Sequence, residues 1–447
     1  MNIKKTLVPA AVLASATCIA ATPQVTSVTM TQSTTSRLVT IDYTFTGADA
    51  VITLDVQTNA PGGAWASIGG AAVCNAQGEV WKKVTNNGST HHITWRPDLS
   101  WPDHVIADGG ARAVVTAWTL DNTPDYMVVD LSAAAQPNTQ AYYPSADFIP
   151  GGIFGRDEYR TTMLVMRKIM AKDVTWTMGS TSLETKRTES REATHQVTLT
   201  NNYYIGVFPI TQTQWSMVGP YRPEPATFNN PTDRSMRPVE CVCYNEIRNS
   251  QNKNADATCD WPADPNSDSF LGKLRTKTGI DFDLPSEAQW EFAARAGNGS
   301  TKWGDGSGIQ NQDMDENLAL FGRYDKNGGK LNSTNPSNSC GATNATAIVG
   351  SYLPNSWGIY DMAGNVWEWC LDWSEDDITA NGGAVNIDPA HPDKTLSGAA
   401  GANRVMRGGA WSTNASYCRP AYRMTPYPPD SRYFDIGLRV VCTAGLR

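Results

Sequence analysis

Long loops dominate the sequence from residue 161 to the C-terminus, and they constrain the fold more than any other feature. Short strand-like segments such as Val174–Met178 alternate there with stretches rich in Gly, Asn, Asp and Pro. Such loops are uncommon in a compact domain unless they are functional or firmly packed. The chain contains 37 Gly and 15 Trp, which suit a loop-rich fold held together by aromatic side chains. We therefore expect residues 161–447 to form one α+β domain with little regular structure.

The preceding part of the chain, residues 22–131, has a different pattern. Apolar and polar residues alternate there, as expected of half-buried strands. The strands are separated by turn signals such as Pro61-Gly62-Gly63 and Asp108-Gly109-Gly110. Short strands with such turns predict a β-sandwich of the immunoglobulin or fibronectin type. The residues that repeat on one face of a strand are Val39, Ile41, Tyr43, Phe45, Ile52, Leu54, Val56, Val114, Thr116, Trp118 and Leu120.

Residues 1–21 have the pattern of a secretory signal peptide. Lys4 and Lys5 precede an apolar stretch over residues 6–16, and small residues follow at Ala20 and Ala21. The apolar stretch is much shorter than the roughly 20 residues needed to cross a bilayer, and no later segment is apolar enough. We therefore predict a protein without a membrane span that is secreted, periplasmic or on the cell surface. Residues 132–160, first Ala-rich and then punctuated by Pro and Gly, are predicted to be a linker.

Charge and cysteine content narrow the possible partners and the compartment. The formal net charge is −8 and no run of Lys or Arg occurs. Because phosphate binding needs a concentrated basic face, we do not expect nucleic acid as a partner. Of the nine cysteines, eight follow Cys18. In an oxidising compartment some of these should form disulfides, although the pairing cannot be read from the sequence.

Several motifs in the C-terminal part occur in a fixed order. They are Met178-Gly179-Ser180, Phe208-Pro209-Ile210-Thr211, Leu284-Pro285-Ser286-Glu287-Ala288-Gln289-Trp290, Gly358-Ile359-Tyr360-Asp361-Met362-Ala363-Gly364-Asn365-Val366-Trp367-Glu368-Trp369, Arg407-Gly408-Gly409-Ala410-Trp411 and Ile436-Gly437-Leu438-Arg439. In order and spacing, residues 161–445 resemble the formylglycine-generating enzyme (sulfatase-modifying factor) family. The resemblance implies a variant of the C-type lectin fold.

One of these motifs also predicts a helix by itself. Ser286 and Gln289 have the spacing of a capping box, and Gly297 can end the helix that follows. Trp290 and the pair Ala293-Ala294 then lie on the face expected to be buried.

The family resemblance also implies bound calcium. One family site corresponds to Asp361, Gly364, Val366 and Glu368, where two carboxylates and two backbone carbonyls suit a hard cation. The alternative is that both carboxylates merely cap turns. Gly341 stands where the family has an Asp, so a second family site is weaker. That second site would use Asn317, Leu318, Gly341 and Thr343.

The site that carries the family's chemistry is incomplete in this sequence. Family enzymes oxidise a cysteine of a sulfatase peptide to formylglycine with O₂ and copper(I), which two cysteine thiolates hold. When the sequences are aligned on Gly408-Gly409, one thiolate position falls on Cys418 but the other falls on Thr413. The oxygen-site serine of the family falls on Ala410. Cys370 or Cys442 could in principle supply a second thiol by approaching Cys418.

Residues 411–435, called the C-terminal segment below, support a different hypothesis, a binding module that keeps the fold without the oxidase. The segment combines aromatic with short polar residues, a composition typical of adaptable recognition surfaces. An extracellular protein or a glycan is the expected ligand. The alternative is that half of the aromatic residues are core, as expected of Trp411. The predicted ligand-binding residues are Asn414, Tyr417, Tyr422, Tyr427, Tyr433 and Phe434.

Two further possibilities stay open. The C-terminal segment resembles the variable region of target proteins of diversity-generating retroelements, which lies between an Arg-Gly-Gly-x-Trp start and an Ile-Gly-x-Arg end. The second possibility is a working copper-dependent formylglycine-generating oxidase that uses Cys418. The positions implied as variable are Thr413, Asn414, Ser416, Tyr417, Tyr422, Thr425, Tyr427, Ser431, Tyr433 and Asp435.

Overall fold

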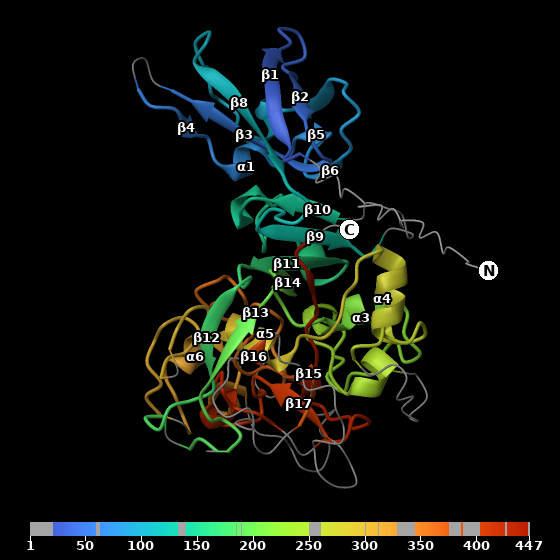
Figure 1. Ribbon diagram of the computed structural model, residues 1–447, viewed down its shortest axis with the longest axis vertical. Helices are drawn as coiled ribbons and strands as arrows, with labels where there is room; N and C mark the ends of the chain where they lie inside the picture. Colours follow the sequence, from blue (N-terminus) through green and yellow to red (C-terminus); the bar gives the residue numbers. More distant parts are fainter. Residues whose placement is uncertain are drawn as a thin grey trace, which may run out of the picture.

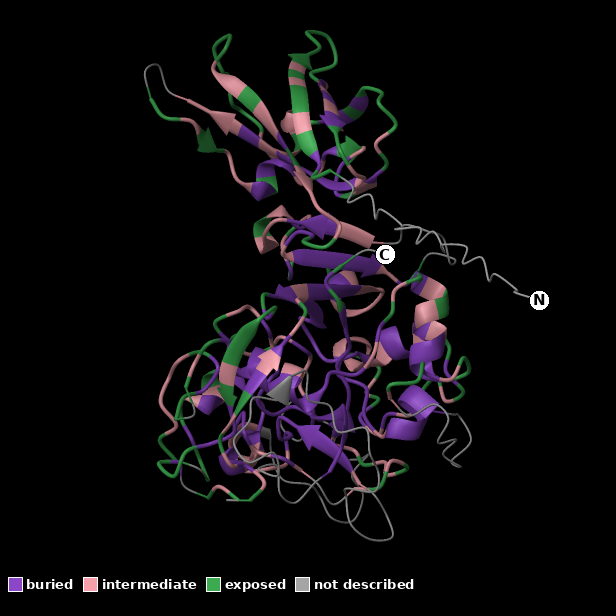
Figure 2. Cartoon of the chain, viewed as in Figure 1, coloured by how far each residue is buried: buried purple, intermediate pink, exposed green. Residues whose placement is uncertain are grey.

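The computed structural model places two antiparallel sheets at one end of the molecule and the loop-rich domain at the other (Figure 1). Most residues inside the loop-rich domain are buried. The loops and strands of the two N-terminal sheets instead carry many exposed residues (Figure 2). The described residues are 21–59, 63–132, 140–184, 186–188, 190–249, 261–299, 301–311, 313–328, 345–374, 386–387, 403–424 and 427–445. Of the predicted signal peptide, only Ala21 lies within the described residues. Thr343 lies outside them.

The N-terminal part is all-β, as its alternating pattern predicts. One sheet has the strand order β1-β2-β7-β5, and in the other β3 pairs with β4, β6 and β8. All of these pairs are antiparallel. The immunoglobulin or fibronectin type of this pair of sheets stays a prediction. The strands are β1 (Gln24–Gln32), β2 (Val39–Thr46), β3 (Ala50–Thr58), β4 (Ala66–Ser67), β5 (Gln77–Gly78), β6 (Lys82–Val84), β7 (His91–Trp95) and β8 (Ala111–Trp118), with short helices α1 (Gly70–Val73) and α2 (Pro97–Ser100).

The alternation in β2 sorts its side chains as predicted, whereas β8 differs. Val39, Ile41, Tyr43 and Phe45 are all buried, and their neighbours along β2 are not. On β8 the buried residue is Val115, which lies on the face opposite to the one formed by Val114, Thr116 and Trp118. The reason is that both faces of β8 carry apolar residues, so the sequence pattern alone does not select one of them.

A five-stranded sheet joins the two ends of the molecule. Its order is β10-β9-β11-β14-β19, from β9 (Tyr126–Asp130), β10 (Gln140–Tyr143), β11 (Met163–Ile169), β14 (Tyr203–Gly206) and β19 (Val441–Thr443). The sequence placed β9 in the N-terminal sandwich and β10 in the linker. Both strands pair instead within the sheet of the C-terminal domain, because their apolar faces complete its core.

The remaining strands and helices of the C-terminal domain are short. Two three-stranded sheets have the orders β12-β13-β16 and β17-β15-β18. Most of the domain between them is loop, as the Gly- and Pro-rich sequence predicts. The strands are β12 (Val174–Met178), β13 (His195–Leu199), β15 (Trp367–Trp373), β16 (Asn386–Ile387), β17 (Arg404–Arg407) and β18 (Ile436–Gly437), and the helices are α3 (Gln212–Val218), α4 (Phe270–Thr278), α5 (Glu287–Arg295), α6 (Leu318–Phe321) and α7 (Asp325–Gly328).

Helix α5 forms where the capping box predicts. The Ser286 side chain accepts a hydrogen bond from Gln289 N, and the Gln289 side chain accepts one from Ser286 N. Trp290 and the pair Ala293-Ala294 are buried in the core. The helix stops one residue before the predicted glycine, because Ala296 already adopts a left-handed conformation with φ of 48°.

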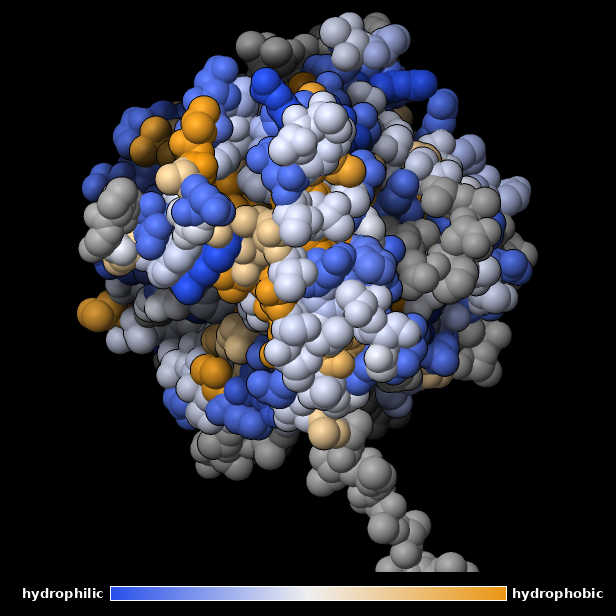
Figure 3. Space-filling model, turned by 90° about the horizontal axis from the view of Figure 1, so that it is seen from above, coloured by the Kyte–Doolittle hydropathy of each residue, from blue (hydrophilic) through white to orange (hydrophobic). Residues whose placement is uncertain are grey.

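The face seen from the end that carries the N-terminal sheets is mainly hydrophilic, with hydrophobic side chains scattered between the polar ones (Figure 3). Across the described ranges, no helix has both the length and the apolar character required to cross a bilayer.

Candidate functional site

A groove of about 400 Å³ opens beside the C-terminal segment. Its base includes Trp367 and Ile436, which the parallel pairing of β15 with β18 holds side by side. Asp325, at the start of α7, is fixed beside Thr413 because its backbone N–H donates to Thr413 O at 2.8 Å. We call this site the C-terminal groove. Its lining residues are Asp325, Trp367, Ser412, Thr413, Asn414, Tyr417, Met424, Tyr427, Asp435 and Ile436.

Three of the six predicted ligand-binding residues line the C-terminal groove. Asn414, Tyr417 and Tyr427 do so, and the ring of Tyr417 lies edge-on to that of Tyr422 at 4.9 Å. Tyr422 supports the groove from below, since its ring also packs 5.9 Å from the ring of Trp367. Tyr433 is 45% exposed and contacts Tyr427 edge-on at 5.0 Å.

Phe434 belongs to the packing of the domain and not to the groove wall. Its ring lies 6.0 Å from that of Trp411 and 6.2 Å from that of Phe228. Trp411 is fully buried, as the sequence predicts. The alternative that part of the aromatic set is core is therefore correct for these two residues.

Sequence reasoning missed several groove residues because they come from elements far apart in the chain. Asp325 precedes the C-terminal segment by about 90 residues, and Trp367 appeared only as part of a family motif. Asp435 was considered only as a variable position. Asp435 directly precedes the motif Ile436-Gly437-Leu438-Arg439, and this position was the one signal that could have placed it near the site.

The groove carboxylate Asp435 lies in a poorly solvated position. Burial raises its pKa to about 6, and the Ser412 hydroxyl donates to its Oδ2 at 3.1 Å. Behind it lies Glu240, which is fully buried and accepts a hydrogen bond from Phe228 N at 2.8 Å. Burial raises the pKa of Glu240 to about 8. In the described part of the chain no basic side chain pairs with Glu240.

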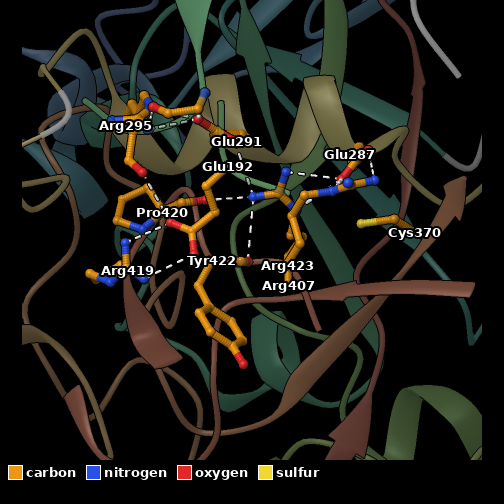
Figure 4. Close-up of polar contacts among 12 residues, drawn as sticks. Glu192, Glu287, Glu291, Arg295, Cys370, Arg407, Arg419, Pro420, Tyr422 and Arg423 are labelled. Carbon is orange, nitrogen blue, oxygen red and sulfur yellow. Dashed lines mark hydrogen bonds and ion pairs between the residues drawn. The ribbon is translucent and has the colours of Figure 1, made fainter. Parts of the chain in front are cut away.

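Buried ion pairs hold the backbone that carries the C-terminal segment (Figure 4). Arg407, just before the Gly-Gly turn, lies 3.0 Å from Glu287 Oε2 and 3.0 Å from Glu291 Oε2, both on α5. It also donates to Pro420 O at 2.7 Å, which fixes the far side of the segment. Burial alone would raise the pKa of Glu291, but Arg295 and Arg407 hold it below its usual value.

Two further arginines complete this framework. Arg423 donates two hydrogen bonds to Glu287, and Arg419 pairs with Glu184 and Glu192. Both guanidinium groups are buried and point inward (Figure 4). We call Arg407, Arg419 and Arg423 the arginine anchors. Their buried ion pairs hold the backbone of the segment in place. The side chains between them can therefore line the groove without being needed for the stability of the fold.

The copper position holds one thiol and one hydroxyl. Thr413 Oγ1 lies 3.8 Å from Cys418 Sγ and is held by Ala410, whose N–H donates to it at 3.0 Å. Burial raises the pKa of the Cys418 thiol to about 12. Gly409 must be glycine here, since a Cβ at this position would approach Cys418 Sγ to 2.5 Å. The structure thus brings Thr413 and Ala410 next to Cys418, and a thiol beside a hydroxyl does not fit a two-thiolate copper(I) site.

Neither alternative thiol joins Cys418. Cys370 and Cys442 pack in two other buried clusters, separate from the one that contains Cys418. All six cysteines within the described ranges are unpaired, including Cys74, Cys241 and Cys243. Cys259 and Cys340 lie outside those ranges.

The residues of the better-matched calcium site already satisfy one another. Glu368 accepts from Trp290 Nε1 at 2.6 Å and pairs with the Arg439 guanidinium through both of its oxygens. Together these donors occupy the roughly four lone-pair sites of the carboxylate. Asp361 accepts from Gly350 N and Asn365 Nδ2.

In this arrangement the Arg439 guanidinium supplies the positive charge that the Glu368 carboxylate needs. The carbonyl of Gly364 accepts from Val366 N at 3.0 Å, which closes the turn between them. Gly364 is required at this turn, because a Cβ would approach Arg323 O to 2.1 Å. At the weaker second site, Asn317 donates its side-chain amide to Gly308 O, and Leu318 begins α6. Calcium at either position stays a prediction.

Comparisons with known proteins agree on the C-terminal domain. Residues 137–444 match the family model for the Sulfatase-modifying factor enzyme 1-like domain. The formylglycine-generating enzyme of Thermomonospora curvata is 36% identical over 164 residues, which are 35% of this chain and 48% of that protein. The enzyme of the same name from Streptomyces coelicolor is 35% identical over 170 residues, which are 36% of this chain and 47% of that protein. The chain therefore spans about half the length of the curated relatives it matches.

Among solved structures, Treponema denticola variable protein 1 is similar with a TM-score of 0.44 and 26% identity. The similarity covers 63% of this chain and 95% of that one.

Proposed function

Since this chain belongs to the family of sulfatase-modifying factor enzyme 1-like proteins, we propose that its C-terminal domain binds a ligand in the C-terminal groove and does not oxidise cysteine. One observation carries the proposal: the partner of Cys418 is the Thr413 hydroxyl, at 3.8 Å, where oxidation would need a second thiolate. The same residue, Thr413, lines a groove walled by tyrosines. We further propose that the protein acts outside the cytoplasm, on the basis of its N-terminal pattern.

The division of labour within the C-terminal segment supports binding. The arginine anchors are buried and paired with glutamates, whereas Thr413, Asn414, Tyr417 and Tyr427 line the groove. Rigid tyrosines offer a large contact area at a low entropic cost. The same division suits a diversified surface, because groove side chains can change while the anchors stay. That finer proposal requires near-identical gene copies to differ only within residues 411–435, and changes scattered along the chain would contradict it.

A double substitution tests the groove directly. The purified wild type is first applied to an array of 12-residue peptides and oligosaccharides to find the probes that it binds. We expect the double variant Tyr417→Ala, Tyr427→Ala to lose binding to those probes. The physical reason is that each lost ring removes both contact area and a wall of the groove. The measurement is the bound fluorescence of labelled protein on the array.

Tyr221→Ala is the matched control, since Tyr221 is 71% exposed and lies outside the groove. This variant should bind the array as the wild type does. If the wild type retains no probe, or if the double variant retains the same probes equally well, the proposal is wrong.

The alternative function is a copper-dependent formylglycine-generating oxidase. Its one structural support is Cys418, which occupies the family's thiolate position. No step of that reaction can be assigned to Thr413 or Ala410.

A further inference from the structure

Ten described residues line the C-terminal groove, and they include two carboxylates, Asp325 and Asp435, and no basic side chain. Asp435 accepts a hydrogen bond from the neutral Ser412 hydroxyl. Within the described ranges, neither carboxylate forms an ion pair with Lys, Arg or His. Among the described residues, the groove therefore presents negative charge that no basic side chain compensates.

The arginines of the C-terminal segment do not supply the missing charge, because other acidic residues already hold them. Arg419 pairs with Glu184 and Glu192, and Arg423 pairs with Glu287. Arg432 donates to Glu246 at 3.0 Å. Each of these partners lies outside the groove lining.

The aromatic walls of the groove favour a cationic ligand, as the carboxylates do. Trp367, Tyr417 and Tyr427 line the groove, and the faces of such rings attract cations. A neutral ligand would remove water from Asp435 without providing a compensating charge, which is unfavourable. A cationic ligand gains from both kinds of residue.

We infer that the C-terminal groove binds a lysine or arginine side chain of a partner protein, an inference that rests on the function proposed above. The volume of about 400 Å³ falls in the range of sites that enclose a small ligand, so one long side chain can enter. Ser412 and Asn414 offer polar groups beside the rings. Tyr, Ser and Asn together are the composition of surfaces that recognise proteins, which favours a protein over an amino sugar.

A pair of peptides that differ only in charge tests this inference on the full chain. The probes are acetyl-Gly-Lys-Gly-Lys-Gly-amide and the same peptide with both lysines acetylated, titrated calorimetrically. We expect the unmodified peptide to bind about tenfold more tightly or better, since it alone makes charge-assisted contacts. Asp325→Asn and Asp435→Asn should each weaken its binding by a similar factor. Asp430→Asn is the matched control, because Asp430 is an exposed carboxylate of the same segment outside the groove, and it should change nothing.

Three outcomes would overturn the inference. The acetylated peptide could bind equally well, the two groove substitutions could leave binding unchanged, or an oligomer of glucosamine could bind more tightly than the lysine peptide. In each case the proposed binding function still stands if array probes require Tyr417 and Tyr427. The proposed function fails separately if no array probe requires those tyrosines.

Discussion

Arg407→Ala should destabilise the protein by about 3–5 kcal/mol, because it removes one partner from a buried set of ion pairs. Arg407 is fully buried and contacts Glu287, Glu291 and the carbonyl of Pro420. Glu291 is also fully buried and pairs with both Arg407 and Arg295. Without Arg407, it keeps only the pair with Arg295 among these two. Urea unfolding of the two proteins measures the difference in the free energy of unfolding.

Arg234→Ala is the control for this substitution. Arg234 pairs with Glu224 at the surface, where the side chains are 42% and 67% exposed. Its removal should cost less than about 1 kcal/mol. An equal loss in both variants would mean that the buried pairs do not hold the C-terminal segment in place. Arg407→Lys should recover only part of the stability, because an ammonium group lacks the planar fork that reaches both glutamates.

Glu240→Gln should make the protein more stable than the wild type at pH 9, and the two should be nearly equal at pH 4.5. Burial raises the pKa of Glu240 to about 8, above its unfolded value of 4.5. The stability that this group provides is complete below pH 4.5 and is lost as the pH rises to about 8. The difference should reach several kcal/mol, since each pKa unit corresponds to about 1.4 kcal/mol. Denaturant unfolding at several pH values measures it.

The comparison of the two proteins isolates Glu240 from other titrating groups. Asp435 and Asp361, whose pKa values burial raises to about 6, are present in both. Glu224→Gln, at an exposed glutamate, is the control and should not become more stable than the wild type at pH 9. A difference for Glu240→Gln that does not change with pH would show that Glu240 is not held neutral.

The parts of the fold that local chemistry determines could be predicted from the sequence. The capping box of Ser286 and Gln289 begins α5 as expected, and the alternation in β2 gives its buried face. These features depend on residues close in sequence, so a single sequence contains the information.

The arrangement of the site depends on contacts between distant residues, and the sequence could not supply it. Asp325 reaches the groove only because its backbone bonds to Thr413, about 90 residues later. The pairing of Arg419 with Glu184 and Glu192 spans more than 200 residues. The pairing of β9 with β11 across the expected linker is another contact between residues far apart in the sequence.

Thr413 is central to the proposed function for two reasons. It stands at the position where the family resemblance implies a metal ligand, and it is also part of the groove wall. The arginine anchors hold the surrounding backbone through their buried pairs with Glu287, Glu184 and Glu192. Under the proposed function, the family fold would serve binding in place of oxidation.

The central claim is tested most directly by incubating the purified chain with copper(I), O₂ and a Cys-x-Pro-x-Arg peptide, and measuring the peptide mass. We predict no conversion of the cysteine to formylglycine and no stoichiometric copper in the wild type, whereas Thr413→Cys should gain one copper(I) per chain because it restores the second thiol. Conversion of the peptide by the wild type would contradict the account.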